Sequence, residues 1–568
     1  MSTTTGSTRL APTRPTGAAW RDGPAAIAGI VATLAALGVS ELLAGLLPGA
    51  TSLLAAVAQV IVDNQPPGAK DVFVGLFGTN DKLALEVIIA LVAMLIGAGL
   101  GLVARRRFDI AAVAFIAFGV VGFLASLRDP LANPAIAAAA TAIAIGAGLW
   151  VLGWLLDLSR PVVTAAAAAP ASGTTRIAPL GASESAAGSG RPTPVSASAV
   201  RKSMGRPVAE MPDWSRRAFI IRAGAAGVGA VALGVIGRNL LERQRIPPAG
   251  DGPAVPPASV TVSGVTPDED LSTSVTGLTP IVMPNDRFYR IDTSFLTPSL
   301  STTDWTLRIY GMVERETTLT WAQLIQLPMF EQYVTIACVS NEVGDKLVGN
   351  AKWTGVRLRD VLDIAGVQAG ATQLVGRTSV SDFTAGMPMA WVMDPAREPM
   401  IALKMNDEPL PPNHGYPARL IVPGLYGYVS ATKWLTELEV TTLEAVDGYW
   451  VPLGWAKEAP ILTQSRIDTP RGGVAAGQVP IAGIAWAPDR GISRVEVAID
   501  GVWGDARMSH PISDATWVQW VTDWPATPGR HEIMVRATDG TGAVQEQIPS
   551  PPAPDGARGW HTISVQVG

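Results

Sequence analysis

The only cysteine of the chain, Cys338, is the residue whose surroundings point most directly to chemistry. One cysteine in 568 residues excludes an intrachain disulfide and a zinc site built from several thiolates. The β-branched residues of 333–338 predict a buried strand, and the glycines and asparagines of 339–350 predict a loop whose backbone can approach a ligand closely. A soft thiolate on such a loop suits a soft, high-valent metal. A nucleophile lacks a histidine nearby in sequence to activate it, and a plain core residue is the third interpretation.

Basic and polar motifs occur on both sides of this loop. They are Asn285-Asp286-Arg287-Phe288-Tyr289-Arg290, Asn406-Asp407-Glu408-Pro409-Leu410, His414-Gly415-Tyr416-Pro417-Ala418-Arg419 and Lys433-Trp434. Guanidinium and ammonium groups that converge on one point are what a doubly charged phosphate needs. Taken singly, each basic residue has an ordinary surface or ion-pair explanation, and His414 has that of a structural hydrogen bond.

Arranged in this order around one thiol, the motifs resemble the molybdopterin-binding domain of the sulfite oxidase family. The resemblance covers 281–568, and the part after 446 is similar to that family's molybdenum-cofactor dimerisation domain. It implies a molybdenum cofactor with Cys338 as the protein ligand to the metal. The residues implied to hold the pterin and its phosphate are Arg290, Asn341, His414, Arg419 and Lys433. Tyr449 falls where the family has a tyrosine facing the metal, although an ordinary sandwich edge explains it equally well.

Two departures from the family pattern concern the substrate. Sulfite oxidases carry arginines just after the Cys-x-x-Asn motif, where this chain has Glu342 and Val343. The segment 428–432 likewise has no basic residue where sulfite oxidases place them. A carboxylate beside the metal would repel sulfite, so we expect a small neutral or cationic substrate.

The reaction that the resemblance implies is oxygen-atom transfer at molybdenum, for which the protein supplies a thiolate, a phosphate cradle and a substrate pocket. The direction stays open, so a sulfoxide or N-oxide reductase similar to the methionine-sulfoxide reductases is the alternative within this class. A cofactor-free binding protein displayed at the cell surface is the alternative from another class. The electron-transfer partner, a quinone or a cytochrome, is also left open.

The first half of the chain has the character of a membrane protein. The chain is 48% hydrophobic and only 16% charged. Apolar runs near the length of a membrane-spanning helix occur at 24–48, 83–104, 110–126, 134–156 and 218–237. The stretch 51–62 is too short to span and predicts an interfacial or re-entrant segment. All four histidines follow the fifth run, so no haem is expected between paired imidazoles of these helices. A net charge of −5 without a basic, aromatic-interleaved tract argues against nucleic acid as a partner.

The distribution of Lys and Arg predicts the orientation. These residues gather before the first run, after the second, and between the fourth and fifth, which makes the N-terminus cytoplasmic and the C-terminal half extracytoplasmic. Ser215-Arg216-Arg217-Ala218-Phe219-Ile220 resembles a twin-arginine export signal within the chain, or is ordinary positive flanking. Glu41 and Glu86 fall in or beside apolar runs, either as functional groups or as residues that reach an interface.

The sequence thus predicts a multi-domain chain. The expected order is a four-helix membrane domain at 1–160, a disordered cytoplasmic linker at 161–217, a fifth membrane helix at 218–241, an extracytoplasmic tether at 242–280, an α+β molybdopterin-binding domain at 281–445 and an immunoglobulin-like β-sandwich of dimerisation type at 446–568. The composition of the linker cannot bury a core. The tether is rich in Pro, Gly and Thr and is expected to let the following domain stand off the membrane. Whether the sandwich forms a homodimer stays open.

Local signals support the two C-terminal domains. Thr320-Trp321-Ala322-Gln323 predicts a capping box that opens a short helix, and the apolar spacing within 358–365 predicts another helix that ends at Gly366. The segment 418–422 predicts a buried strand. Alternation of apolar and polar residues over 494–499, ahead of Asp500-Gly501, predicts a sandwich strand followed by a tight turn.

Overall fold

The computed structural model describes residues 17–66, 76–77, 81–129, 132–159, 213–244, 253–294, 297–298 and 300–568. The predicted linker lies outside these residues as far as 212, as do the first arginines of the chain. The chain divides into two compact units. One contains Met1–Val39, Leu91–Phe118 and Ile143–Ala232, and the other contains Ser40–Ala90, Gly119–Ala142 and Leu233–Gly568.

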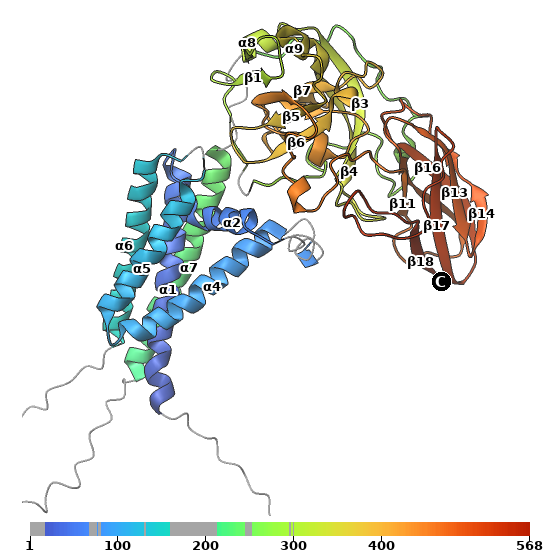
Figure 1. Ribbon diagram of the computed structural model, residues 1–568. Coiled ribbons are helices and arrows are strands. Elements are labelled where there is room, and N and C mark those ends of the chain that lie inside the picture. The colour runs from blue at the N-terminus through green and yellow to red at the C-terminus, as the bar shows by residue number, and fades with distance from the viewer. Residues whose placement is uncertain are drawn as a thin grey trace, which may run out of the picture. The chain divides into compact units, whose positions relative to one another are not determined.

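Long helices make up the apolar half of the chain (Figure 1). Their bounds are α1 (Gly17–Leu46), α4 (Asp81–Ala104), α5 (Phe108–Ser126), α6 (Pro134–Leu158) and α7 (Asp213–Gln244). These five are long and apolar enough to cross a membrane by length and composition, which suggests membrane association. The stretch predicted to be too short to span forms the separate helix α2 (Leu53–Asp63).

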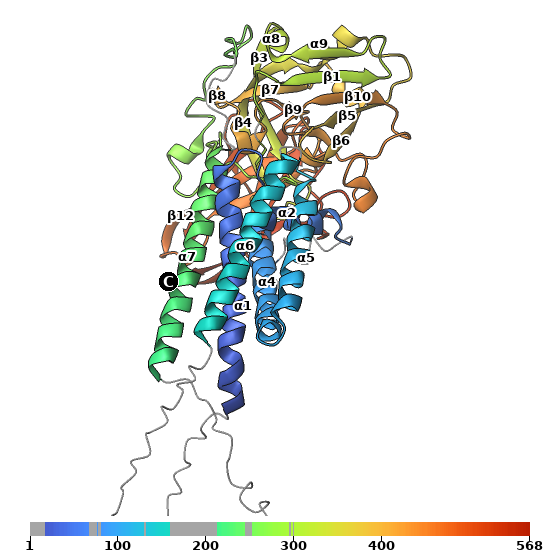
Figure 2. The same ribbon diagram turned by 90° about the vertical axis from the view of Figure 1, so that its left-hand side faces the viewer.

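Glycines allow close approach between these helices. In the first unit, a Cβ on Gly29 of α1 would overlap the backbone of Gly97 in α4, and one on Gly38 would overlap the backbone of Ala230 in α7. Figures 1 and 2 show α1 and α7 side by side. Contacts between small residues are a common way for helices to associate in lipid, where packing rather than water exclusion supplies the attraction.

Two carboxylates in the helices of the second unit have polar partners. Arg238 of α7 forms an ion pair with Glu86 of α4, with 3.0 Å between Nη2 and Oε1. Ser52 donates a hydrogen bond to the buried carboxylate of Glu41. These partners lower the free-energy cost of burying both carboxylates. Neither side chain therefore has to extend to the membrane–water interface to be stabilised.

Two sheets form the scaffold of the cysteine site. Their strand orders are β2-β1-β10-β5-β6 and β3-β4-β7-β8, with β9 paired to β7. The bounds are β1 (Thr306–Gly311), β2 (Thr317–Thr320), β3 (Met329–Ala337), β4 (Val348–Arg357), β5 (Gln373–Arg377), β6 (Thr384–Pro388), β7 (Met400–Met405), β8 (Glu408–Pro409), β9 (Arg419–Ile421) and β10 (Glu437–Thr441). The short helices are α8 (Trp321–Leu324), α9 (Leu358–Ala365), α10 (Met389–Val392) and α11 (Gly427–Ser430). The region contains more strand than the α+β expectation suggests.

The local signals of this region are confirmed. The capping box is present, because Gln323 Oε1 accepts from Thr320 N at 2.8 Å and Thr320 Oγ1 accepts from Gln323 N at 3.4 Å. Helix α9 ends at Gly366, whose φ of 72° favours glycine. Strand β3 covers most of the predicted strand at 333–338. Fully buried Trp353 on the neighbouring strand β4 packs in the same core as the apolar side chains of β3.

The C-terminal region contains two antiparallel four-stranded sheets (Figure 1). Their orders are β11-β12-β16-β15 and β14-β13-β17-β18. The bounds are β11 (Gln464–Thr469), β12 (Gly477–Trp486), β13 (Ile492–Ile499), β14 (Val502–Asp505), β15 (Arg507–Met508), β16 (Val518–Ala526), β17 (Gly529–Asp539) and β18 (His561–Val567). Val497 and Val535 of one sheet share a core with Trp520 and Trp524 of the other. Aliphatic side chains and two tryptophans thus pack between the sheets, without a disulfide.

The described part of the predicted tether, from residue 253, is folded onto the C-terminal domains. Ser259 donates its N–H to the carbonyl of Met329 at 2.9 Å. Leu271, Val275 and Leu278 are buried against strands β12 and β16. The expectation of a tether is therefore wrong for this part, which is packed and not a free connection. The prediction relied on the Pro- and Gly-rich composition of the segment. Its few apolar residues are nevertheless enough to anchor it to an existing core.

Candidate functional site

Cys338 lies directly after β3, where the chain turns into a tight loop. Its backbone N–H donates to the carbonyl of Leu347 at 2.9 Å, and Leu347 N donates to Asn341 Oδ1 at 2.7 Å. Asn341 is nine-tenths buried, and its hydrogen bond with Leu347 fixes the base of the loop. Cys338 itself is 8% exposed. The predicted arrangement of a strand, the thiol and a loop is present.

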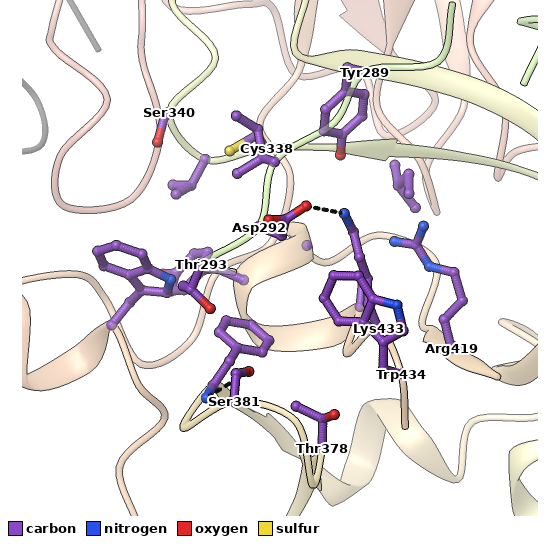
Figure 3. Close-up of a pocket in the computed structure, with 18 of the residues that line it drawn as sticks. Tyr289, Asp292, Thr293, Cys338, Ser340, Thr378, Ser381, Arg419, Lys433 and Trp434 are labelled. Carbon is purple, nitrogen blue, oxygen red and sulfur yellow. Dashed lines mark hydrogen bonds and ion pairs between the residues drawn. The ribbon is translucent and has the colours of Figure 1, made fainter. Parts of the chain in front are cut away.

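A cavity opens in front of this cysteine (Figure 3). Charged side chains that line it are Asp292, Arg419 and Lys433. Most other side chains of the wall are aromatic or carry a hydroxyl group: Phe288, Tyr289, Thr293, Ser340, Thr378, Ser381, Phe383, Tyr428, Trp434, Trp450 and Trp455. Figure 3 shows Cys338 and Tyr289 on one side of the space, with the nitrogen atoms of Arg419 and Lys433 directed into it.

The side chain of Arg419 is held by a backbone carbonyl and still has an N–H group available as a donor. Its Nη1 donates to the carbonyl of His414 at 3.1 Å, and its guanidinium lies over the ring of Trp353. Its Nε has no hydrogen-bond partner within the described part of the chain. Burial lowers the pKa of Arg419 to about 10, so the group remains charged at neutral pH. A buried cation with an unsatisfied donor is suited to receive an anion.

Lys433 provides the second buried positive charge. Its Nζ donates to the carbonyl of Asn413 at 3.0 Å and to Asp292 Oδ2 at 3.1 Å. Burial lowers the pKa of Lys433 to about 8, although the neighbouring Asp292 carboxylate acts in the opposite direction. Lys433 is therefore mostly protonated at neutral pH and becomes neutral in mildly alkaline solution.

His414 lies behind the cavity wall. Its Nε2 is 3.0 Å from the carbonyl oxygen of Asn285, and because a carbonyl only accepts, this nitrogen carries the proton. Nδ1 is buried and has no partner among the described residues. Burial, followed by the charges of Lys433 and Arg419, lowers the pKa of His414 to about 3. The imidazole is thus neutral and has a free acceptor.

Arg290 is linked to the cavity through an aspartate that the sequence did not single out. Its guanidinium is more than a third exposed and does not line the wall, but its Nε donates to Asp292 Oδ2 at 3.0 Å. Asp292 is almost completely buried and lies two residues after the motif that ends at Arg290. Its position next to a basic motif was the sequence signal from which Asp292 could have been predicted to belong to the site. Tyr289, within the motif, also faces the cavity.

The predicted effect of Glu342 on the substrate is not supported by its position. Glu342 is exposed and is not part of the cavity wall. Ser340 lines the wall instead, and most of the other uncharged side chains of the wall are aromatic or carry a hydroxyl group. Glu342 therefore does not repel an anionic substrate. An anion is disfavoured because the described residues of the wall include no basic side chain besides Arg419 and Lys433.

Tyr449 lies one layer behind the wall. Its ring contacts Phe383 and Trp450, with ring centroids 6.1 and 5.1 Å apart, and both of these neighbours line the cavity. Its backbone N–H donates to the carbonyl of Thr384 at 3.1 Å. Burial raises the pKa of Tyr449, which keeps the phenol protonated. The structure thus does not bring Tyr449 to the wall with Cys338.

The residues at the cavity fit a metal that is bound as part of an organic cofactor. No group of three His, Cys, Asp or Glu side chains suited to a metal occurs in the described ranges. One soft thiol faces the cavity, so further metal ligands would have to come from a cofactor. The unpartnered Nε of Arg419 and Nδ1 of His414 fit the phosphate and the polar ring system of a pterin.

The chain is similar in sequence to several known proteins. Residues 294–450 match the family described as the oxidoreductase molybdopterin binding domain. Mitochondrial sulfite oxidase of Homo sapiens is 29% identical over 326 residues, which are 48% of this chain and 59% of that protein. The NADH nitrate reductase of Solanum lycopersicum is 27% identical over 310 residues, which are 43% of this chain and 34% of that protein. The crystal structure of the sulfane dehydrogenase SoxCD from Paracoccus pantotrophus has 25% identity and a TM-score of 0.45, with 51% of this chain and 82% of that chain covered.

Proposed function

Since residues 294–450 are a molybdopterin-binding domain of the sulfite oxidase family, the chain is an oxidoreductase with a molybdenum cofactor, and we propose that it transfers an oxygen atom to or from a small organic substrate other than sulfite. The predicted family, cofactor and enzyme class are confirmed by these matches. The matched sulfite oxidase is covered over 59% of its length. Reaction and substrate are therefore inferred from the residues of this chain.

One observation carries the proposal: the single thiol of the chain opens on a cavity that also contains two buried basic groups. Cys338 supplies a soft donor to the metal, and Arg419 and Lys433 bind the phosphate at the other end of the pterin. Neutral His414 lies behind the wall next to Arg419, and its unpartnered Nδ1 is an acceptor of the kind that a pterin N–H needs. When bound, the cofactor supplies the metal at which oxygen transfer takes place.

The other site residues support this set from behind. Asn341 keeps the cysteine loop closed, and Arg290 helps to hold Asp292 against Lys433. Tyr449 supports Phe383 and Trp450 in the wall, so we assign it a positioning role. The phenol of Tyr289, which faces the cavity, is the better candidate for contact with the reacting atoms.

The cavity wall favours a neutral or cationic substrate. Arg419 and Lys433 are needed for the phosphate, and the remaining wall offers aromatic faces and hydroxyl groups. Aromatic faces attract apolar groups and cations but provide no charge for a sulfite dianion. A reductase of sulfoxides or N-oxides is the second candidate, because a polar oxide with apolar substituents matches the same wall. A cofactor-free surface-binding protein is the candidate from another class, and it leaves the convergence of thiol and buried bases unexplained.

We further infer that the enzyme is anchored in the cell membrane by its helices, with a cytoplasmic N-terminus and an extracytoplasmic catalytic domain. The five apolar helices and the distribution of Lys and Arg support this arrangement. Export of a folded, cofactor-loaded domain suits the twin-arginine interpretation of Ser215-Arg216-Arg217. The two C-terminal sheets would form the immunoglobulin-like dimerisation domain. Electrons would pass to or from a quinone or a cytochrome.

The test is a substrate screen on the full chain, purified in detergent from a host that makes the cofactor. Stoichiometric molybdenum is expected by metal analysis. A redox dye should then report turnover with at least one sulfoxide, N-oxide or neutral sulfur compound, and little with sulfite. Molybdenum near zero would favour the binding-protein alternative, and turnover of sulfite alone would overturn the substrate assignment.

A further inference from the structure

The far end of the cysteine loop rests on the C-terminal sandwich. Arg466 of β11 is 4% exposed, and its Nη1 donates to the carbonyl oxygen of Asp345 at 2.7 Å. The same guanidinium donates through Nη2 to Thr279 Oγ1 at 2.9 Å and through Nε to Asp468 Oδ1 at 2.7 Å. Each nitrogen atom of this guanidinium thus donates a hydrogen bond, so the planar, fork-shaped group has a defined orientation toward the loop.

A second sandwich residue packs against the same loop. Gly344, with a φ of 86°, lies against the imidazole of His561, and a Cβ at Gly344 would overlap that ring. His561 is fixed in turn, because its Nδ1 accepts from the backbone N–H of Ile467 at 2.9 Å. The loop therefore has a hydrogen-bond anchor at Asp345 and a steric stop at Gly344, both provided by the sandwich.

The strand that leads into Cys338 is attached to the same domain. Thr335 donates its N–H to the carbonyl of Ala515 at 2.9 Å, and its Oγ1 accepts from Trp517 N at 2.8 Å. Thr335 is fully buried. The residues before and after the cysteine are thus both tied to the sandwich, whereas the bonds between Cys338, Asn341 and Leu347 fix only the base of the loop.

We propose that the sandwich is a working part of the cysteine site, in which Arg466 and His561 are positioning residues that hold the thiol of Cys338 toward the cavity. The proposal rests on the proposed function insofar as that thiol is the metal ligand. A buried, charged pair such as Arg466 and Asp468 is costly to assemble, and packed apolar residues could have replaced it. The guanidinium of Arg466 explains why the pair is present. It also donates to the carbonyl of Asp345 in the loop, which an apolar side chain could not bind.

The test uses the reactivity of the only thiol. Full-length protein is made without cofactor, and its alkylation by iodoacetamide is followed by mass spectrometry beside a melting curve. Arg466→Lys keeps a positive charge next to Asp468 but loses the fork. We expect Cys338 to react roughly tenfold faster in this variant, because a loop that has lost charge-assisted hydrogen bonds opens more often. Arg471→Ala is the matched control, since Arg471 contacts Asp468 but not the loop.

Labelling that is unchanged in Arg466→Lys, or equally faster in both variants, would overturn the proposal. His561→Asn provides an independent variant that keeps an acceptor for Ile467 N and withdraws the ring from Gly344, so it remains available if Arg466→Lys does not fold. Faster labelling is expected there too, and an unchanged rate in folded protein would count against the proposal. Absence of molybdenum from the wild-type chain would instead defeat the proposed function, while the labelling result would still decide how the loop is held.

Discussion

Lys433 donates a hydrogen bond to the buried carboxylate of Asp292, with 3.1 Å between Nζ and Oδ2 (Figure 3). Arg290 donates to the same oxygen from 3.0 Å. Lys433, which we assign to the cofactor phosphate, and Arg290, which supports it from behind, thus share one internal anion. A phosphate entering the cavity has to displace this carboxylate or share its cations, so the charge of Lys433 is decisive for cofactor binding.

Binding of a phosphate group should therefore weaken as the pH rises through about 8. Burial lowers the pKa of Lys433 to about 8, so the amine is charged below that pH and neutral above it. Calorimetric titration of pyrophosphate into cofactor-free protein at several pH values between neutral and mildly alkaline would measure this. Lys433→Arg should flatten the profile, because a guanidinium stays protonated throughout. Equal affinity of the wild-type protein across the range would contradict the role of Lys433.

Cys338→Ser should abolish turnover while leaving the fold intact. A hydroxyl is mostly protonated and is a poor ligand for a soft metal, so activity should fall by orders of magnitude. The residues have similar size, and the pterin phosphate would still be held by Arg419 and Lys433. Activity and melting temperature are measured on the same preparation. Retained turnover with a lowered melting temperature would identify Cys338 as a core residue.

Sulfite should be a poor substrate, and one added positive charge should improve it. Ser340 lines the cavity two residues after the cysteine, and the described residues of the wall include no basic side chain besides Arg419 and Lys433. Ser340→Arg should raise kcat/KM for sulfite by roughly tenfold, since a charge-assisted hydrogen bond contributes about 1.5–3 kcal/mol. Ser340→Gln, similar in length but uncharged, is the control. An equal gain with Gln would show that size and not charge matters.

Tyr289 and Tyr449 should respond differently to the loss of their hydroxyl groups. Tyr289 faces the cavity, whereas Tyr449 packs behind Phe383 and Trp450. Tyr289→Phe should lower kcat/KM by roughly tenfold or more, as expected when a donor near the reacting atoms is lost. Tyr449→Phe should change it less than about threefold, because the ring that supports the wall remains. A larger loss for Tyr449→Phe would restore the tyrosine that the family pattern indicates.

The C-terminal half should be accessible from outside the cell. Protease added to intact spheroplasts should digest the chain beyond residue 253, while antibodies against the N-terminal segment detect a protected fragment. Lysed spheroplasts provide the control, in which the N-terminal segment is digested as well. Full protection of the C-terminal half in intact spheroplasts would refute the proposed orientation.

The sequence alone was sufficient for features that depend on local chemistry. Apolar runs indicated the long helices, since a chain in lipid must satisfy its backbone within the helix. Thr320 and Gly366 marked helix ends because capping involves neighbouring residues only. Cys338 stood out because it is the only thiol and is followed by a loop with glycines and asparagines, and the order of the motifs around it pointed to the family and its cofactor.

Tertiary structure alone decided which of these residues share the cavity. It placed Asp292 between Lys433 and Arg290, exposed Glu342 to solvent, set Tyr449 behind the wall and folded the predicted tether onto the core. It also joined Arg466 to the cysteine loop across 121 positions of sequence. Composition and spacing cannot report such contacts, because the direction of a side chain depends on how distant strands pack and not on its neighbours in the chain.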